Sequence, residues 1–152
     1  MDFKFKKELI LNNLNDTNEF GLKLAKLLPN GSTVLLDGDL GAGKTTLVRA
    51  IAKGLNIKEV VQSPTFNIMK IYLKGDRPLI HIDAYRLKDN NVDIGLDEYI
   101  GYELGLTFIE WSQYIENLLP KNSIMISLIN ENHNENRKVI IRSNDEGLIN
   151  QI

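Results

Sequence analysis

The stretch Gly38-Asp39-Leu40-Gly41-Ala42-Gly43-Lys44-Thr45-Thr46 fits the pattern G-x-x-x-x-G-K-[ST] of a phosphate-binding loop. The residues before it, Thr33-Val34-Leu35-Leu36, are short and apolar, as in a buried strand. After it, residues 46–55 carry apolar side chains at helical spacing and a glycine near their end. Strand, glycine loop and helix therefore follow one another in the order that such a loop requires, which predicts a nucleoside triphosphate site.

Each residue type in the loop has a physical role. The glycines permit backbone conformations that a Cβ would block, so successive N–H groups can point at phosphate oxygens beside the positive end of the next helix. Lys44 would reach the β- and γ-phosphates, the Thr45 hydroxyl would bind Mg²⁺, and Thr46 would add a phosphate contact. The alternative is a glycine-rich turn with a solvated lysine, and the flanking strand and helix argue against it.

Length and composition limit the class of protein. A chain of 152 residues suits one domain, which we expect at residues 1–143, followed by a flexible tail at 144–152. The net charge of −2 offers no broad basic face, so nucleic acid would be reached only through partners. The absence of cysteine excludes disulfides, thiolate metal sites and a cysteine nucleophile. No apolar run reaches ~18 residues, so we expect a soluble, cytoplasmic protein.

Hydrophobic periodicity predicts the other elements. We expect strands at residues 3–11, 67–73, 78–83, 106–110, 124–129 and 139–142, and helices from Asp16 (capped together with Glu19), within 88–105 and from Ser112. This order predicts a single-domain P-loop NTPase fold, a three-layer α/β/α arrangement with a mixed parallel and antiparallel sheet.

Two apolar strands end in a carboxylate, Asp83 and Glu110. Both ends would open at the same edge of the sheet as the phosphate loop if these strands run parallel to the loop strand. Mg²⁺ takes only one or two protein carboxylates, so one acid would touch the ion while the other orients its waters or the attacking water. Which acid takes which role stays open. For His81, two residues before Asp83 and facing away from its neighbours, we expect a structural role.

Several further residues each allow two interpretations. Thr65 resembles a switch threonine that closes on Mg²⁺ when a γ-phosphate is present, or it bonds to its own loop backbone. Trp111 is a core aromatic or lies at the site, and Arg86 pairs with Asp83 or with a phosphate of a partner. The acidic residues between 89 and 103 fit solvated helix faces, with a docking patch as the alternative. We expect no arginine in or next to the phosphate loop.

Four segments together resemble the TsaE family. They are residues 38–46, Ser63-Pro64-Thr65-Phe66, His81-Ile82-Asp83-Ala84-Tyr85-Arg86-Leu87 and Phe108-Ile109-Glu110-Trp111-Ser112, within a resemblance that spans Asp16 to Arg142. It implies phosphate contacts from Gly38 through Thr46, Mg²⁺ on Thr45 and Glu110, Asp83 in the active site near the ion, and Trp111 beside it. Ser112 stands where many members carry proline.

The resemblance also implies an activity and partners. It points to an ATP hydrolase, with ATP and Mg²⁺, that supports threonylcarbamoyladenosine modification of tRNA. The implied role is to reset the complex of a TsaD-type transferase subunit and its TsaB-type homologue, with tRNA contacted only indirectly. The main alternative is a P-loop small-molecule kinase, although the five arginines do not cluster as in a lid. A GTPase is the third alternative, weakened because the chain contains no Asn-Lys-x-Asp motif for guanine recognition. A non-catalytic nucleotide sensor in an assembly is the fourth.

Overall fold

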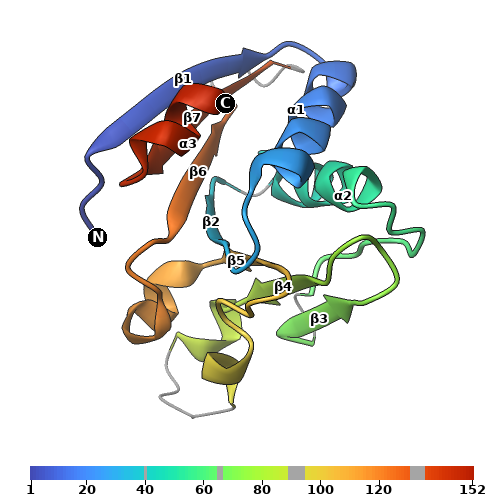
Figure 1. The fold of residues 1–152 in the computed structure, drawn as a ribbon, viewed down its shortest axis with the longest axis vertical. Coiled ribbons are helices and arrows are strands. Elements are labelled where there is room, and N and C mark those ends of the chain that lie inside the picture. Colours follow the sequence, from blue (N-terminus) through green and yellow to red (C-terminus); the bar gives the residue numbers. More distant parts are fainter. Residues whose placement is uncertain (40, 65–66, 89–94, 131–135) are drawn as a thin grey trace.

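The structure of the protein is a computed structural model that describes residues 1–39, 41–64, 67–88, 95–130 and 136–152 (Figure 1). A seven-stranded sheet of order β1-β7-β6-β2-β5-β4-β3 forms its centre. The strands are β1 (Phe5–Leu11), β2 (Thr33–Asp37), β3 (Met69–Tyr72), β4 (Leu79–Asp83), β5 (Leu106–Glu110), β6 (Ile124–Ile129) and β7 (Arg137–Ser143). Neighbours among β4, β5, β2 and β6 pair in parallel, whereas β1 with β7, β6 with β7, and β3 with β4 pair antiparallel. The predicted mixed sheet is confirmed.

The sequence pattern of each strand follows its place in the sheet. The central strands β4 and β5 are buried along their whole length, and their near-continuous apolar runs suit parallel strands that are covered on both faces. The edge strand β1 alternates exposed and part-buried residues, in keeping with one covered face. The phosphate-loop strand β2 thus lies in the middle of the sheet, between β5 and β6.

Three α-helices cover one face of the sheet: α1 (Leu14–Leu27), α2 (Lys44–Gly54) and α3 (Glu146–Gln151). Helices α1 and α2 lie side by side in Figure 1, and a Cβ at Gly21 would be 2.4 Å from the Cβ of Ala50, so this glycine permits their close approach. The other face carries the 3₁₀ segments η1 (Tyr85–Leu87), η2 (Leu96–Glu98) and η3 (Ser112–Leu118), which pack on β2, β4 and β5. The three layers are as predicted, with 3₁₀ turns as the third.

Three helix predictions were wrong in detail. Among residues 95–105, where a helix was expected, the only helical segment is the short η2, because Gly95 and Gly101 both adopt φ 79° and interrupt it. The segment from Ser112 is 3₁₀ and is kinked at Ile115. Helix α1 begins earlier than predicted: its N-cap is Asn13, whose Oδ1 accepts from the N–H of Asp16 at 2.9 Å.

The C-terminal residues also differ from expectation. Instead of a frayed tail, residues 146–151 form α3, and the Asp145 side chain caps it by accepting from the N–H of Leu148 at 3.1 Å. Leu148, Ile149 and Ile152 are buried in the same core as α1 and α2. A helix of six residues has too few turns for its apolar pattern to be recognised in the sequence, and tertiary packing stabilises it.

Arg77, in the connection between β3 and β4, ties that connection to the end of α1. Its guanidinium donates to the carbonyl oxygens of Leu28 at 2.6 Å and Ala25 at 2.5 Å. Burial lowers the pKa of the Arg77 guanidinium, and the charge of neighbouring Asp76 opposes part of this change. These bonds satisfy carbonyl groups that the last turn of a helix leaves without intrahelical donors.

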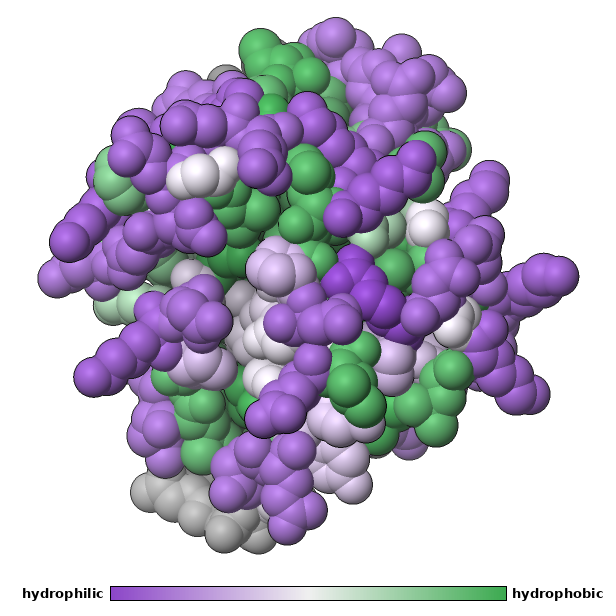
Figure 2. All heavy atoms as spheres, viewed as in Figure 1, coloured by the Kyte–Doolittle hydropathy of each residue, from purple (hydrophilic) through white to green (hydrophobic). Residues whose placement is uncertain are grey.

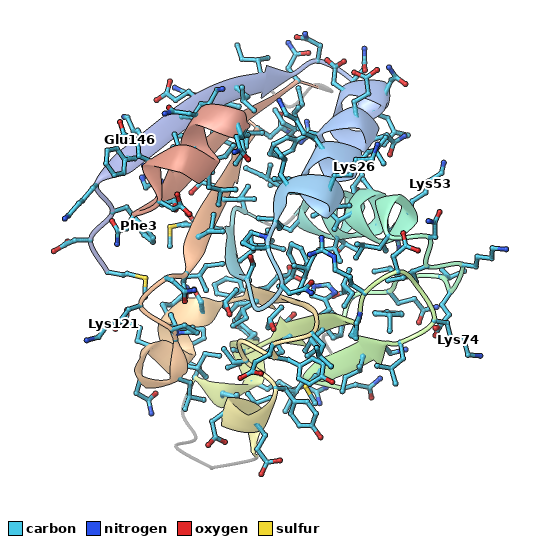
Figure 3. All side chains as sticks on the ribbon, viewed as in Figure 1. Phe3, Lys26, Lys53, Lys74, Lys121 and Glu146 are labelled. Atoms are coloured by element: carbon cyan, nitrogen blue, oxygen red, sulfur yellow. The ribbon has the colours of Figure 1, made fainter. Side chains whose placement is uncertain are left out.

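The surface is of mixed character. Figure 2 shows hydrophilic residues over much of the face seen in Figure 1, with hydrophobic residues between them. Lys26 and Lys53 are exposed in the last turns of α1 and α2, where their charge complements the helix dipole, and Figure 3 labels both on these helices. In the described part of the chain, no helix has the length and apolar character needed to cross a membrane.

Candidate active site

The loop between β2 and α2 has the geometry of an anion-binding site. Gly41 and Gly43 adopt φ 81° and 100°, left-handed values that favour glycine. Gly43 is the N-cap of α2 and makes no side-chain cap, in contrast to Asn13 and Asp145 at the other two α-helices. The first N–H groups of α2 have no acceptors within the helix, and together with the helix dipole they favour a bound phosphate.

Lys44, the first residue of α2, lies between the loop and a strand-end carboxylate. Its Nζ donates to the carbonyl oxygen of Gly38 at 2.6 Å and is 3.8 Å from Oε1 of Glu110. The same Nζ lies 5.3 Å from the ring centre of Trp111. The ammonium group thus contacts three parts of the pocket at once: the phosphate loop, the end of β5 and the segment that follows it.

The two predicted carboxylates lie side by side. Asp83 ends β4 and Glu110 ends β5, and the two residues are direct register partners in parallel strands. Because β5 also pairs in parallel with β2, both acids open at the edge of the sheet that carries the phosphate loop, as predicted. Each is only 5% exposed. Oδ1 of Asp83 accepts from the N–H of Tyr85 at 3.0 Å, which fixes the turn after β4.

His81 contacts the site directly. Its Nε2 lies 2.8 Å from Oε2 of Glu110, and the imidazole ring is fully buried. The sequence analysis correctly placed His81 on the face opposite to its strand neighbours, since Ile80 and Ile82 pack in the other core. Strand periodicity also puts His81 on the face of Asp83. That shared face was the feature in the sequence that indicated proximity to the site.

An open pocket of about 670 Å³ joins these groups. Its described lining residues are Gly41, Gly43, Lys44, Thr45, Thr46, Ser63, Asp83, Tyr85, Glu110 and Trp111. The Thr45 hydroxyl and two carboxylates are hard oxygen donors of the kind that Mg²⁺ prefers. No group of three or more His, Cys, Asp or Glu that could hold a metal occurs in the described chain.

A second cavity, of about 200 Å³, adjoins the first at Gly43 and Thr46. The sequence analysis did not predict it, because its walls come from distant parts of the chain. Apolar and polar side chains share its lining: Leu11, Asn13, Leu14, Thr17, Ala42, Leu47, Leu128 and Arg137. A cavity next to the phosphate site that combines apolar walls with hydrogen-bonding groups suits a further part of a nucleotide.

The prediction that no arginine lies next to the phosphate loop was wrong, because Arg137 contacts it. From the start of β7, its Nε donates to the carbonyl oxygen of Ala42 at 2.9 Å, and its Nη2 lies 3.5 Å from the carbonyl oxygen of Gly41. The residues are 95 and 96 positions apart in the chain, so only the pairing of β7 with β6 brings them together. The guanidinium braces the outer side of the loop.

The sequence that builds this site matches a known protein family. The sequence model of the family described as "Threonylcarbamoyl adenosine biosynthesis protein TsaE" matches residues 11–139. The chain belongs to the TsaE family.

Individual relatives agree with this membership. The tRNA threonylcarbamoyladenosine biosynthesis protein TsaE of Bacillus subtilis is 42% identical over 114 residues, 75% of this chain and 72% of the relative. The protein of the same name in Rickettsia felis is 38% identical over 149 residues, 93% of this chain and 84% of the relative. A crystal structure of Bacillus subtilis YdiB is 29% identical and superposes with a TM-score of 0.80, covering 99% of this chain and 93% of that chain. The predicted P-loop fold is confirmed.

The segments that carry the TsaE resemblance meet at the two cavities. Residues of the loop, Ser63, and the ends of β4 and β5 line the larger one. Within the loop, Ala42 lines the smaller cavity, the Gly38 carbonyl holds Lys44, and Asp39 is exposed while its carbonyl accepts from the N–H of Ala42 at 3.0 Å. Two predicted contact residues, Leu40 and Thr65, lie outside the described residues.

Three aromatic residues, Tyr85, Trp111 and Tyr114, contact one another beside the larger pocket, and Tyr85 and Trp111 line it. Trp111 stacks on Tyr114 with ring centres 5.9 Å apart, and Tyr85 meets Trp111 edge-on at 5.0 Å. Trp111 adopts φ 59°, an unusual value for a bulky residue and one often found at functional sites. It packs on the edge of the core and also lines the pocket, so it combines the two predicted roles. Arg86 is exposed in η1, next to this aromatic group.

Proposed function

We propose that this chain is a Mg²⁺-dependent ATPase that supports threonylcarbamoyladenosine modification of tRNA by binding and resetting the threonylcarbamoyltransferase complex. One observation carries the nucleotide part: Lys44, at the uncapped N-terminus of α2, lies 3.8 Å from a strand-end carboxylate, Glu110. Family membership supports the pathway. A phosphate loop beside buried acids is the arrangement that binds a triphosphate together with a divalent cation.

The two adjoining cavities divide the nucleotide between them. The phosphates would lie at the N-terminus of α2, with Lys44 on the β- and γ-phosphates and loop N–H groups around them. The base and ribose would enter the smaller cavity, against Leu11 and Leu14 and near the guanidinium of Arg137. Arg137 would also keep the loop carbonyls turned outward, which leaves the N–H groups on the phosphate side.

Glu110 and Asp83 would have different roles around the metal ion. Thr45 and Glu110 would hold Mg²⁺, whose chemistry is to neutralise charge on the phosphates. Oε1 of Glu110 already faces the Lys44 ammonium in the pocket. Asp83, with Oδ1 accepting from the Tyr85 N–H, would orient the attacking water or the water shell of the ion.

The variants Glu110→Gln and Asp83→Asn should therefore differ in effect. Glu110→Gln removes a charged metal ligand, so the Mg²⁺ concentration needed for nucleotide binding should rise about tenfold or more. Asp83→Asn removes the group that positions water, so binding should change little while the hydrolysis rate falls about 10²-fold. Titration of Mg²⁺ against nucleotide binding, together with phosphate release, measures both. Wild-type turnover in both variants would contradict both assignments.

The partners are a TsaD-type transferase subunit and its TsaB-type homologue. The net charge of −2 argues against a direct tRNA grip, so tRNA would be contacted through these subunits. This role would place the protein in the cytoplasm, with the tRNA that is modified.

A turnover experiment tests the resetting role. In a mixture of both subunits, tRNA, threonylcarbamoyl donor and Mg·ATP, omission of this chain should limit the product to about one modified tRNA per transferase complex. Its addition should give many turnovers, because the resetting step is then supplied. Sustained turnover in its absence would exclude the proposed role.

A further inference from the structure

Among the described residues, the polar contact of the His81 side chain is with Glu110. The imidazole is fully buried in β4, and its Nε2 lies 2.8 Å from Oε2 of the carboxylate. A carboxylate oxygen only accepts, so Nε2 must be the donor. The contact joins neighbouring strands across 29 positions of the chain, so it is built by the parallel pairing of β4 with β5.

The other ring nitrogen has no described partner. Nδ1 of His81 is buried, and no hydrogen-bond partner for it occurs in the described part of the protein. Such a group weakens the folded state, so its presence needs an explanation. Along β4, the neighbours of His81 on this face are Leu79 and Asp83. On the adjacent strands its register partners are Lys70 and Phe108. An apolar side chain at 81 would fill the space beside Leu79 and Phe108 without an orphaned nitrogen. The bond to Glu110 is the remaining reason for an imidazole.

We propose that His81 is a positioning residue that turns the carboxylate of Glu110 so that Oε1 faces the pocket for a divalent cation. This inference rests on the proposed Mg·ATP site. Oε2 is held by His81, while Oε1 points to the pocket and lies 3.8 Å from Lys44. A glutamate without such an anchor samples several rotamers and must be ordered when the ion binds. A ligand held in place by an outer hydrogen bond avoids that cost.

The same geometry limits the class of ion. Nε2 is engaged by Glu110 and Nδ1 faces the interior, so His81 itself is not a metal ligand. Among the described residues that line the pocket, the metal donors are then hard oxygens, chiefly those of Glu110, Thr45 and Asp83. Those donors suit Mg²⁺ or Mn²⁺, whereas ions that favour imidazole, such as Zn²⁺, lose their preferred ligand.

Two variants of matched size separate donation from packing. His81→Gln places an amide N–H at the same number of bonds from Cβ as Nε2, whereas His81→Met has a similar length and no donor. We would titrate Mg²⁺ against binding of a non-hydrolysable ATP analogue by calorimetry. For His81→Met the Mg²⁺ concentration at half-saturation should rise about 10- to 100-fold. For His81→Gln it should stay within about threefold of wild type, and binding of the analogue in EDTA should be unchanged in both.

A Glu110→Gln background shows whether the two residues act together. If His81 acts only through the carboxylate, His81→Met should add nothing to the Mg²⁺ dependence of Glu110→Gln, which is the result of a coupled pair. Thermal unfolding of each unliganded variant reports packing separately. If His81→Met does not fold, His81→Gln decides alone, because a rise of well over threefold in its Mg²⁺ concentration at half-saturation contradicts a donor role.

The outcomes distinguish this inference from the proposed function. Equal weakening in His81→Gln and His81→Met, or wild-type Mg²⁺ dependence in His81→Met, overturns the positioning role while leaving the Mg·ATP site intact. A wild-type protein that binds the analogue equally with Mg²⁺ and with EDTA overturns the metal site itself, and the role of His81 falls with it.

Discussion

Lys44→Ala is expected to abolish most of the stabilisation that Mg·ATP gives to the protein. A ligand that binds only the folded state at a hundredfold excess over its Kd adds ~2.7 kcal/mol. For a chain of this length that corresponds to a rise in Tm of about 5 to 10 °C. If loss of the ammonium weakens binding about a hundredfold, less than about 1 kcal/mol remains at the same nucleotide concentration. Thermal unfolding with and without Mg·ATP gives both shifts.

The matched control is Lys53→Ala, in the last turn of the same helix. Lys53 is exposed and projects into solvent in Figure 3, at the far end of α2 from the loop. This variant should keep the full Mg·ATP shift, because it removes the same charge away from the site. An equal shift in Lys44→Ala and wild type would remove Lys44 from the phosphate site.

A second measurement of the same event uses Trp111, the one tryptophan of the chain. Its ring lies 5.3 Å from the Lys44 ammonium, so movement of that charge toward phosphates changes the surroundings of the indole. Nucleotide addition should therefore change tryptophan fluorescence in wild type and in Lys53→Ala, and should change it less in Lys44→Ala.

The features of the site that the sequence predicted are those set by short-range patterns. The order strand, glycine loop, helix is contained in residues 33–55, and each part has its own local pattern. The end of a buried strand is likewise visible where an apolar run stops at Asp83 or Glu110. Parallel pairing of β4, β5 and β2 then brings these ends together without further information.

The contacts that the sequence did not predict depend on long-range pairing. Arg137 reaches the phosphate loop only because β7 lies beside β6, which lies beside β2. His81 reaches Glu110 only through the register of β4 on β5. The pattern at 95–105 resembles a helix, but left-handed glycines break it, and α3 is too short to be recognised before its packing is known. Tertiary structure decides each of these cases.

Charge compensation in the free protein is incomplete at the triphosphate. An arginine supplied to the transition state of phosphoryl transfer accelerates it by about 10³ to 10⁵. Arg137 is near the loop, but its guanidinium donates to the carbonyl oxygens of Ala42 and Asn136 and so holds the outer side of the loop. Arg49 donates to the carbonyl oxygen of Val61 at 2.7 Å. Among the described residues that line the larger pocket, the cation is Lys44, whose Nζ lies 3.8 Å from Oε1 of Glu110.

ATP hydrolysis by the isolated chain should therefore be slow. With the TsaD-type and TsaB-type subunits it should be at least about tenfold faster, because a cation from a partner would supply part of the effect of a transition-state arginine. The aromatic group of Tyr85, Trp111 and Tyr114 lies beside the pocket that holds the carboxylates, where a docking partner could bring that cation. Steady-state phosphate release at saturating Mg·ATP, with and without the subunits, measures the increase.

A mixture of the Lys44→Ala variant with the same subunits corrects for any ATP hydrolysis by the subunits themselves. A fast rate for the chain alone, unchanged by the subunits, would instead indicate an independent enzyme such as a small-molecule kinase. Hydrolysis whose rate does not depend on the transferase complex cannot be coupled to the resetting of that complex.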